Sequence, residues 1–133
     1  MNEINNEIYR LEQQGEAIGI MIKECYGRSY KAGWYHNPVT KEPLDRNVPE
    51  MLCLIHSEVS EALEWYRKGL KDDHLPTRPM IEVELADTLI RILDLAGHLN
   101  LDLGGAYADK LMYNATRKDH SLEARAKDGG KLF

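Results

Sequence analysis

Residues 80–98 constrain the fold of this chain more than any other segment. Apolar side chains recur there at steps of three and four residues, which is the spacing of one face of an α-helix. They cover more than half of the circumference of such a helix and leave one narrow polar strip. The strip carries Glu84, Asp87, Arg91, Asp94 and His98. A helix of this kind lies at the centre of a helical protein, and its polar strip faces either a site or another subunit.

The rest of the chain also has helical spacing. Further helices are predicted over residues 2–26, 48–68 and 103–118. Residues 33–47 are expected as a loop and residues 119–133 as a loose tail. With one Phe in 133 residues and many Leu, Glu and Lys residues, the composition favours helix over sheet. We therefore expect one all-α domain over residues 1–133, folded as a bundle of four or five helices.

Charge and cysteine content limit the classes of partner. The net charge of −5 argues against a protein that binds nucleic acid or anionic membranes without specificity. No apolar run approaches the ~20 residues that span a bilayer, and the N-terminus does not resemble a signal peptide. Cys25 and Cys53 lie outside any CxxC pattern, and two cysteines make neither a disulfide framework nor a four-ligand zinc site. A reduced cytoplasm fits this chain best.

Acidic residues three apart occur on two of the predicted helices. The main apolar face of helix 48–68 comprises Leu52, Ile55, Val59, Ala62, Leu63 and Tyr66. Glu58 and Glu61 lie on a stripe beside this face, whereas Glu64 points toward solvent. Glu84 and Asp87 form a second pair on helix 80–98. If the two helices pack side by side, the four acids converge, and a divalent cation would relieve their mutual repulsion.

The types of ligand select among metals. Di-iron carboxylate bundles need Glu-x-x-His motifs, and this chain has none. That absence disfavours a di-metal oxidoreductase. An all-oxygen site selects hard cations such as Mg²⁺ or Mn²⁺. Because Mg²⁺ is usually held by a few carboxylates together with substrate phosphates, the pattern indicates chemistry on phosphate esters or anhydrides.

Two other groups of residues are candidates for substrate contacts. Lys110, Asn114 and Arg117 lie on one stripe of helix 103–118, and two cations with an amide suit phosphate oxygens. A solvated basic face near the end of a helix is the alternative interpretation. Trp34 and Tyr35 could stack on a nucleobase, or they could cover the end of a helical core.

The acids and the basic stripe together resemble a known family. The acidic pattern is Glu58-x-x-Glu61, 22 intervening residues, and then Glu84-x-x-Asp87. It is followed by Lys110-x-x-x-Asn114-x-x-Arg117. Over residues 50–118 the chain resembles the helical nucleoside triphosphate pyrophosphohydrolases of the MazG type. The first fifty residues and the tail match nothing as specific.

The resemblance implies an all-α fold of the MazG or dimeric dUTPase type that assembles into homodimers or homotetramers. It implies Mg²⁺, for which Mn²⁺ can substitute, and hydrolysis of an NTP or dNTP to the monophosphate and pyrophosphate. The metal ligands would be Glu58, Glu61, Glu84 and Asp87. Glu58 and Glu61 are the catalytic candidates, because a glutamate not saturated by metal would activate water. Lys110 and Arg117 would neutralise phosphate charge, and Asn114 would orient the phosphate.

Two alternatives stay open. A relative with a narrower substrate, such as dUTP, dCTP or phosphoribosyl-ATP, would carry the same motif. A non-catalytic helical interaction module would instead use the acids in salt bridges with Lys110, Arg117 or Arg91. Arg91 lies one turn after Asp87, where the two side chains could pair at i,i+4.

Overall fold

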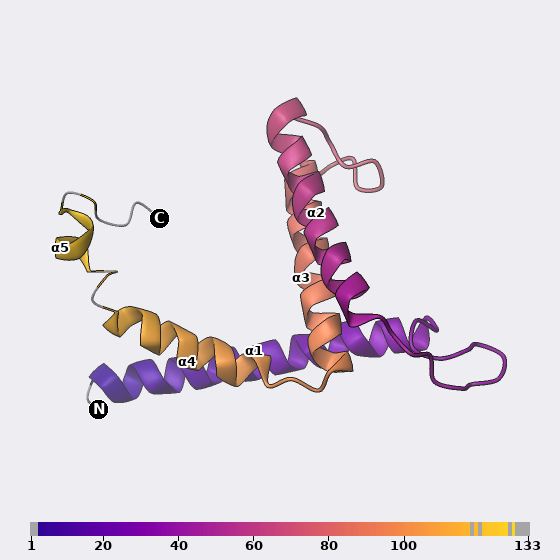
Figure 1. Ribbon diagram of the computed structural model, residues 1–133, viewed down its shortest axis with the longest axis horizontal. Helices are drawn as coiled ribbons and strands as arrows, with labels where there is room; N and C mark the ends of the chain where they lie inside the picture. The colour runs from indigo at the N-terminus through magenta and orange to yellow at the C-terminus, as the bar shows by residue number, and fades with distance from the viewer. Residues whose placement is uncertain (1–2, 118, 120, 128, 130–133) are drawn as a thin grey trace. The chain divides into compact units, whose positions relative to one another are not determined.

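The computed structural model describes residues 3–117, 119, 121–127 and 129, and these residues are helical apart from loops (Figure 1). The helices are α1 (Glu3–Lys31), α2 (Val48–Lys68), α3 (Met80–His98), α4 (Leu103–Thr116) and α5 (Leu122–Arg125). Among the described residues, β-type pairing is limited to two isolated bridges, His36 with Pro43 and Lys71 with Pro79. The predicted all-α fold class is confirmed. No described helix combines the length and apolar character that crossing a membrane requires.

The helix bounds differ from the predicted ones mainly at the two ends of the chain. α1 continues past residue 26 to Lys31, and an ion pair of 2.5 Å between Arg28 and Glu24 lies on its last turns. α1 ends at Lys31, and two residues later Gly33 adopts a φ of +87°, which does not continue a right-handed helix. The short helix α5 lies in the segment expected as a loose tail, and Ser121 caps it by accepting a hydrogen bond from the Ala124 amide. Residues 2 and 118, at predicted helix ends, lie outside the described residues, as do 120, 128 and 130–133 of the predicted tail.

The chain divides into two compact units. The hairpin unit comprises residues 20–101, and the terminal unit comprises residues 1–19 and 102–133. The hairpin unit holds the end of α1, the loop that follows it, α2 and α3. The terminal unit holds the start of α1 together with α4 and α5.

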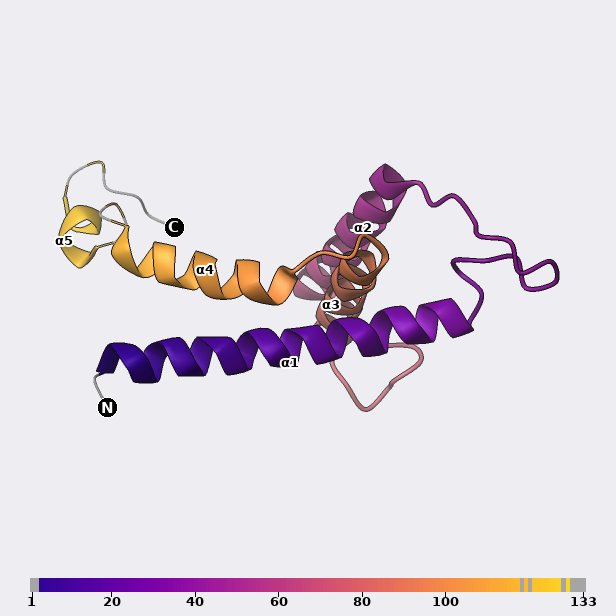
Figure 2. The same cartoon turned by 90° about the horizontal axis from the view of Figure 1, so that it is seen from below.

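In the hairpin unit, α2 and α3 lie side by side (Figures 1 and 2). Local signals set the bounds of α2. The Asn47 side chain accepts a hydrogen bond of 3.1 Å from the Glu50 amide, and Gly69 ends the helix with a φ of 65°. In the connecting loop, the buried Asp72 carboxylate accepts hydrogen bonds from the amides of His74 and Leu75. These bonds close the turn that leads into α3.

The core of the hairpin unit lies between the two helices and under the first loop. Leu93 and Ala96 of α3 are almost completely buried. Tyr35, Met51 and Leu95 form a buried cluster. α1 reaches this core at Gly97, where an added Cβ would lie 2.5 Å from the Cβ of Tyr26. Glycine therefore allows α1 and α3 to approach closely.

The terminal unit contains a second close approach of two helices. A Cβ added to Gly104 of α4 would lie 2.3 Å from the Gly15 carbonyl oxygen of α1. Leu11, one turn before Gly15, is buried. Asp102 begins α4 by accepting a hydrogen bond of 2.9 Å from the Gly105 amide.

Candidate metal centre and adjoining cavity

Three of the four predicted acids converge in the hairpin unit. Glu58 of α2 and Glu84 and Asp87 of α3 each offer a carboxylate oxygen, and these oxygens all lie within 4.8 Å of one another. Glu58 and Glu84 are buried, whereas Asp87 is exposed. Helix geometry explains the arrangement, because Glu84 and Asp87 occupy one face of α3 and α2 packs beside that face. We call these three residues the acidic group.

Glu61, the fourth predicted acid, lies outside the acidic group and is exposed. Its charge nevertheless contributes to raising the pKa of Glu84, so the two carboxylates are close enough to interact electrostatically. Glu64, which was predicted to face solvent, is half-buried and pairs with Lys68 and Arg67.

Burial and negative charge raise the pKa values of two members of the acidic group. Loss of hydration, followed by the charges of Glu61, Glu58 and Asp87 and a hydrogen bond with Glu58, raises the pKa of Glu84 to about 7. Loss of hydration and the Glu58 charge also raise the pKa of Asp87, while Arg91 acts in the opposite direction. Keeping these carboxylates ionised side by side is therefore unfavourable unless positive charge is supplied.

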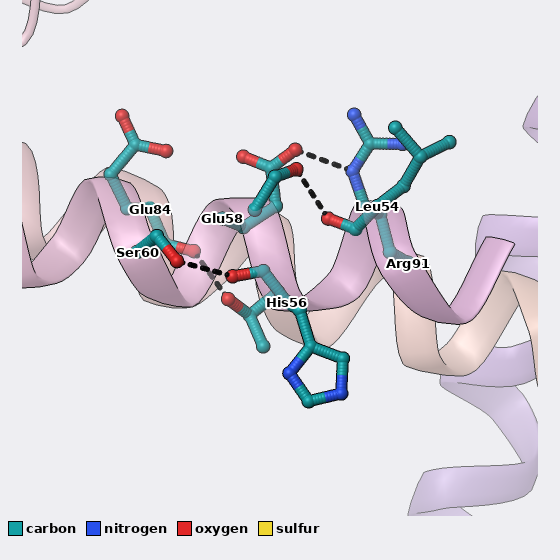
Figure 3. Close-up of polar contacts among 8 residues, drawn as sticks. Leu54, His56, Glu58, Ser60, Glu84 and Arg91 are labelled. Atoms are coloured by element: carbon teal, nitrogen blue, oxygen red, sulfur yellow. Dashed lines mark hydrogen bonds and ion pairs between the residues drawn. The ribbon is translucent and has the colours of Figure 1, made fainter. Parts of the chain in front are cut away.

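Arg91 supplies part of that positive charge, and its direct contact is with Glu58. Its Nε donates a hydrogen bond of 2.6 Å to Glu58 Oε1, which joins α3 to α2. Figure 3 shows Glu84, Glu58 and Arg91 on the same side of the helix pair, while the His56 ring points to the opposite side. The i,i+4 pair of Arg91 with Asp87 was one possible arrangement, and the ion pair that Arg91 forms is this interhelical one. The buried carboxylate gains more from the guanidinium than an exposed one would, because water does not screen the pair as strongly.

A cavity of about 470 Å³ adjoins the acidic group. It is lined by Ser29, Trp34, Arg46, Met51, Leu54, Asp87, Ile90, Arg91 and Asp94. Asp87 thus belongs both to the acidic group and to the cavity wall. A ligand in the cavity could place an anionic end beside the acidic group only if positive charge lay between the two.

The loop between α1 and α2 builds one wall of this cavity. Arg46 Nη1 donates a hydrogen bond of 3.1 Å to the Trp34 carbonyl oxygen, which holds the two ends of the loop together. Trp34 is 60% exposed and lines the cavity. Tyr35 is instead buried and donates a hydrogen bond of 2.6 Å to Asp94 Oδ2. Of the two aromatic residues considered for base stacking, one therefore belongs to the core and the other lines the cavity.

Three charged residues of the cavity wall, Arg46, Arg91 and Asp94, were not among the predicted site residues. Asp94 lies on the predicted polar strip, and its Oδ1 is buried without a hydrogen-bond partner among the described residues. That strip was the available sequence signal for Asp94. Arg46 had no comparable signal, because the bonds that position it depend on how the loop folds.

The predicted phosphate-binding residues lie on α4 and at its end, in the terminal unit. Lys110 Nζ is 4.8 Å from the centroid of the Tyr113 ring, and Arg117 Cζ is 5.9 Å from it. Arg117 also pairs with Asp119 through its Nε and Nη2 atoms. Asn114 Oδ1 is buried and has no hydrogen-bond partner within the described part of the chain. Lys110 and Asn114 lie one turn apart on α4, Arg117 follows the end of this helix with an extended backbone, and the acidic group belongs to the other unit.

Comparison with models of protein families, with curated proteins and with solved structures gave no match. The resemblance to the MazG type therefore depends on the acidic motifs and the α4 stripe alone. What the site can do has to be argued from its own geometry and charge.

Proposed function

We propose that this protein is a Mg²⁺-dependent nucleoside triphosphate pyrophosphohydrolase of the MazG type, releasing a nucleoside monophosphate and pyrophosphate. The observation that carries the proposal is the acidic group. Carboxylates from both predicted motifs, on two different helices, offer oxygens within 4.8 Å of one another.

The residues of the acidic group fit a hard divalent cation. All of their donor atoms are carboxylate oxygens, which is the ligand type that Mg²⁺ and Mn²⁺ prefer. The raised pKa of Glu84 indicates a local excess of negative charge that a cation would offset. Glu58, Glu84 and Asp87 would hold the ion, with Glu61 as a further ligand from the edge of the group. When bound, Mg²⁺ would neutralise phosphate charge and lower the pKa of a bound water.

Within the proposal, the protein residues have distinct roles. Glu61 is exposed and outside the acidic group, so a carboxylate oxygen that the ion leaves free is one candidate to accept a proton from the attacking water. Glu58 is the other candidate, although Arg91 occupies one of its oxygens. Trp34 would stack on the nucleobase from the wall of the cavity. Lys110, Asn114 and Arg117 would bind phosphate oxygens.

The proposal includes a homodimer or homotetramer in the cytoplasm. Among the described helices, extensive packing is confined to α2 with α3, which leaves large apolar side chains exposed. A second copy of the chain would cover them. Both cysteines are free thiols in this structure, and a reducing compartment would keep them so.

The test is a panel of NTPs and dNTPs incubated with Mg²⁺, with pyrophosphate and orthophosphate measured separately. We expect pyrophosphate as the product, no activity in EDTA, and recovery with Mg²⁺ or Mn²⁺. Asp87→Asn should lower kcat by at least about a hundredfold, because its charge would act in the transition state.

Glu64→Gln is the matched control. Glu64 lies on the same hairpin but pairs with Lys68 and Arg67, so its loss should leave kcat unchanged. Full activity in folded Asp87→Asn, or orthophosphate as the first product, would refute the proposal.

One observation favours the alternative of a non-catalytic interaction module. The ion pair between Arg91 and Glu58 is the type of contact that such a module would use. It accounts for only one acid of the group, however, and within the described part of the chain Glu84 forms no ion pair of that kind. A module would hydrolyse no nucleotide and would gain no thermal stability from Mg²⁺.

A further inference from the structure

Arg91 lies where the acidic group meets the cavity. Its Nε is 2.6 Å from Glu58 Oε1, and the same side chain lines the cavity together with Asp87. The Arg91 side chain is 42% exposed, whereas the Glu58 side chain is 10% exposed. One end of this ion pair is therefore buried while the other remains open to solvent and to any ligand in the cavity.

The ion pair and a bound cation would compete for the same carboxylate. A buried carboxylate without a partner is costly, so Glu58 needs either a guanidinium or a metal ion. A divalent cation held by the acidic group would use the Glu58 oxygens and would repel the positive charge of Arg91. Binding of the cation should therefore weaken the contact between Arg91 and Glu58.

We propose that Arg91 pairs with Glu58 in the cation-free protein and is released on cation binding to become a phosphate-binding residue in the cavity. The inference rests on the proposed function, because it takes the cation and the anionic substrate from it. Arginine suits both partners, since its planar guanidinium pairs with carboxylate and with phosphate in the same two-pronged geometry.

Arg91 is better suited to this exchange than the other arginine of the cavity. Arg46 is committed to the loop, where its Nη1 binds the Trp34 carbonyl oxygen and its guanidinium lies 5.6 Å from the centroid of the Tyr35 ring. A carbonyl oxygen keeps its acceptor strength whether or not a cation is present, so nothing releases Arg46. The partner of Arg91 is the very group that a cation would take.

Removal of Arg91 should affect the two ligands in opposite directions. In the absence of nucleotide, the cation no longer competes with a guanidinium, so the affinity of the variant for the cation should rise. With the cation bound, a phosphate ligand loses one charged contact, so the affinity of the variant for phosphate should fall. A residue that only joined α2 to α3 would not produce this pair of effects.

The experiment measures two equilibria on wild type and Arg91→Gln by titration calorimetry. For Mn²⁺ alone, we expect Kd to fall roughly five- to tenfold in the variant. For inorganic tripolyphosphate at saturating Mn²⁺, we expect Kd to rise roughly tenfold or more. Tripolyphosphate carries no base, so Trp34 and the choice of nucleotide do not enter the result.

Arg78→Gln is the matched control, because Arg78 forms an exposed 2.9 Å pair with Glu82 and does not line the cavity. Both dissociation constants should be unchanged in that variant. Arg91→Lys provides a second variant that keeps the charge: its Mn²⁺ affinity should stay near wild type, while its tripolyphosphate affinity should fall several-fold because an ammonium cannot make the two-pronged contact.

Weaker Mn²⁺ binding in Arg91→Gln would overturn the inference, because Arg91 would then support the site rather than compete for it. Unchanged tripolyphosphate binding in both Arg91 variants would overturn it as well. If wild type hydrolyses nucleoside triphosphates and Arg91→Gln changes neither dissociation constant, the proposed function stands and the inference alone is refuted. Wild-type protein that binds no Mn²⁺ refutes both.

Discussion

At the scale of single residues, the distinctive feature is a buried carboxyl group among other acids. Glu84 is buried in the acidic group, and its pKa is raised from an ordinary value of 4.5 to about 7. The folded protein therefore holds a proton on Glu84 more tightly than the unfolded chain does. Between these two values, folding stability must fall as the pH rises.

We expect this pH dependence in metal-free protein. Between about pH 4.5 and pH 7, Glu84 should lower the free energy of unfolding by on the order of 3 kcal/mol. Above pH 7 this contribution should level off, because Glu84 is then ionised in both the folded and the unfolded state. Urea denaturation in EDTA at a series of pH values measures it. Glu84→Gln should flatten the curve, and saturating Mg²⁺ should do so in wild type. The same dependence of stability on pH in wild type and in Glu84→Gln would contradict the raised pKa of Glu84.

The cations of α4 allow a second prediction at this scale. Lys110→Ala and Arg117→Ala should each lower kcat/KM about ten- to a hundredfold, because each removes one charged contact with a phosphate. The melting temperature should change little, since Lys110 is exposed and contacts the Tyr113 ring of the same helix, while Arg117 pairs with Asp119, two residues away. Melting and kinetics are measured on the same samples. A large loss of stability with unchanged kcat/KM would assign these residues to the fold instead.

At the scale of elements, the helices approach each other through glycines. Gly97 of α3 faces Tyr26 of α1, and an added Cβ would overlap the Tyr26 ring atom Cγ at 2.8 Å. Gly27 of α1 has open space at the same position, with nothing within 4 Å. Both are helical glycines in one unit, so they form a matched pair for substitution.

Gly97→Ala should destabilise the protein by about 1–2 kcal/mol, because the overlap outweighs the gain in helix propensity. Gly27→Ala should stabilise it by up to about 1 kcal/mol through propensity alone. Chemical denaturation of both variants gives the two values. Stabilisation by Gly97→Ala would mean that α1 does not pack on α3 in this way.

At the scale of the whole molecule, apolar side chains remain exposed on the helical hairpin. On α2, a stripe formed by Leu52, Val59, Leu63 and Tyr66 is exposed. On α3, Leu85 and Leu89 are also exposed. α2 instead turns Met51, Glu58 and Ala62 inward. Most of the apolar face expected for this helix thus lies beside the contact with α3 and is available to a second copy.

We therefore expect a homo-oligomer in solution. Light scattering at micromolar concentration should give at least twice the 15.3 kDa of one chain. Leu63→Glu should shift the mass toward the monomer, because it places a charge on the exposed apolar stripe. Cys53→Glu, on the same helix but off that stripe, is the control and should keep the oligomer. A wild-type mass near that of one chain would contradict the predicted oligomer.

Local sequence signals were sufficient to predict that the chain is helical. The spacing of apolar residues predicts four helices, and short-range contacts such as Asn47 with Glu50 and the left-handed Gly69 set the bounds of α2. The same spacing places Glu84 and Asp87 on one face of α3, since that depends only on helix geometry. It also singles out Asp94 as a member of the polar strip.

Contacts between distant residues were decided only by the tertiary structure. Arg91 pairs with Glu58, 33 positions away, although Asp87 and Asp94 are both within four positions of it in the sequence. Tyr35 is buried and donates a hydrogen bond to Asp94, while its neighbour Trp34 is exposed and lines the cavity. Such choices depend on which helix faces meet and at what rotation, and several faces of a helix as apolar as α3 can meet a neighbour. Sequence spacing fixes the position of a residue around its own helix, whereas packing decides which residue of another helix it contacts.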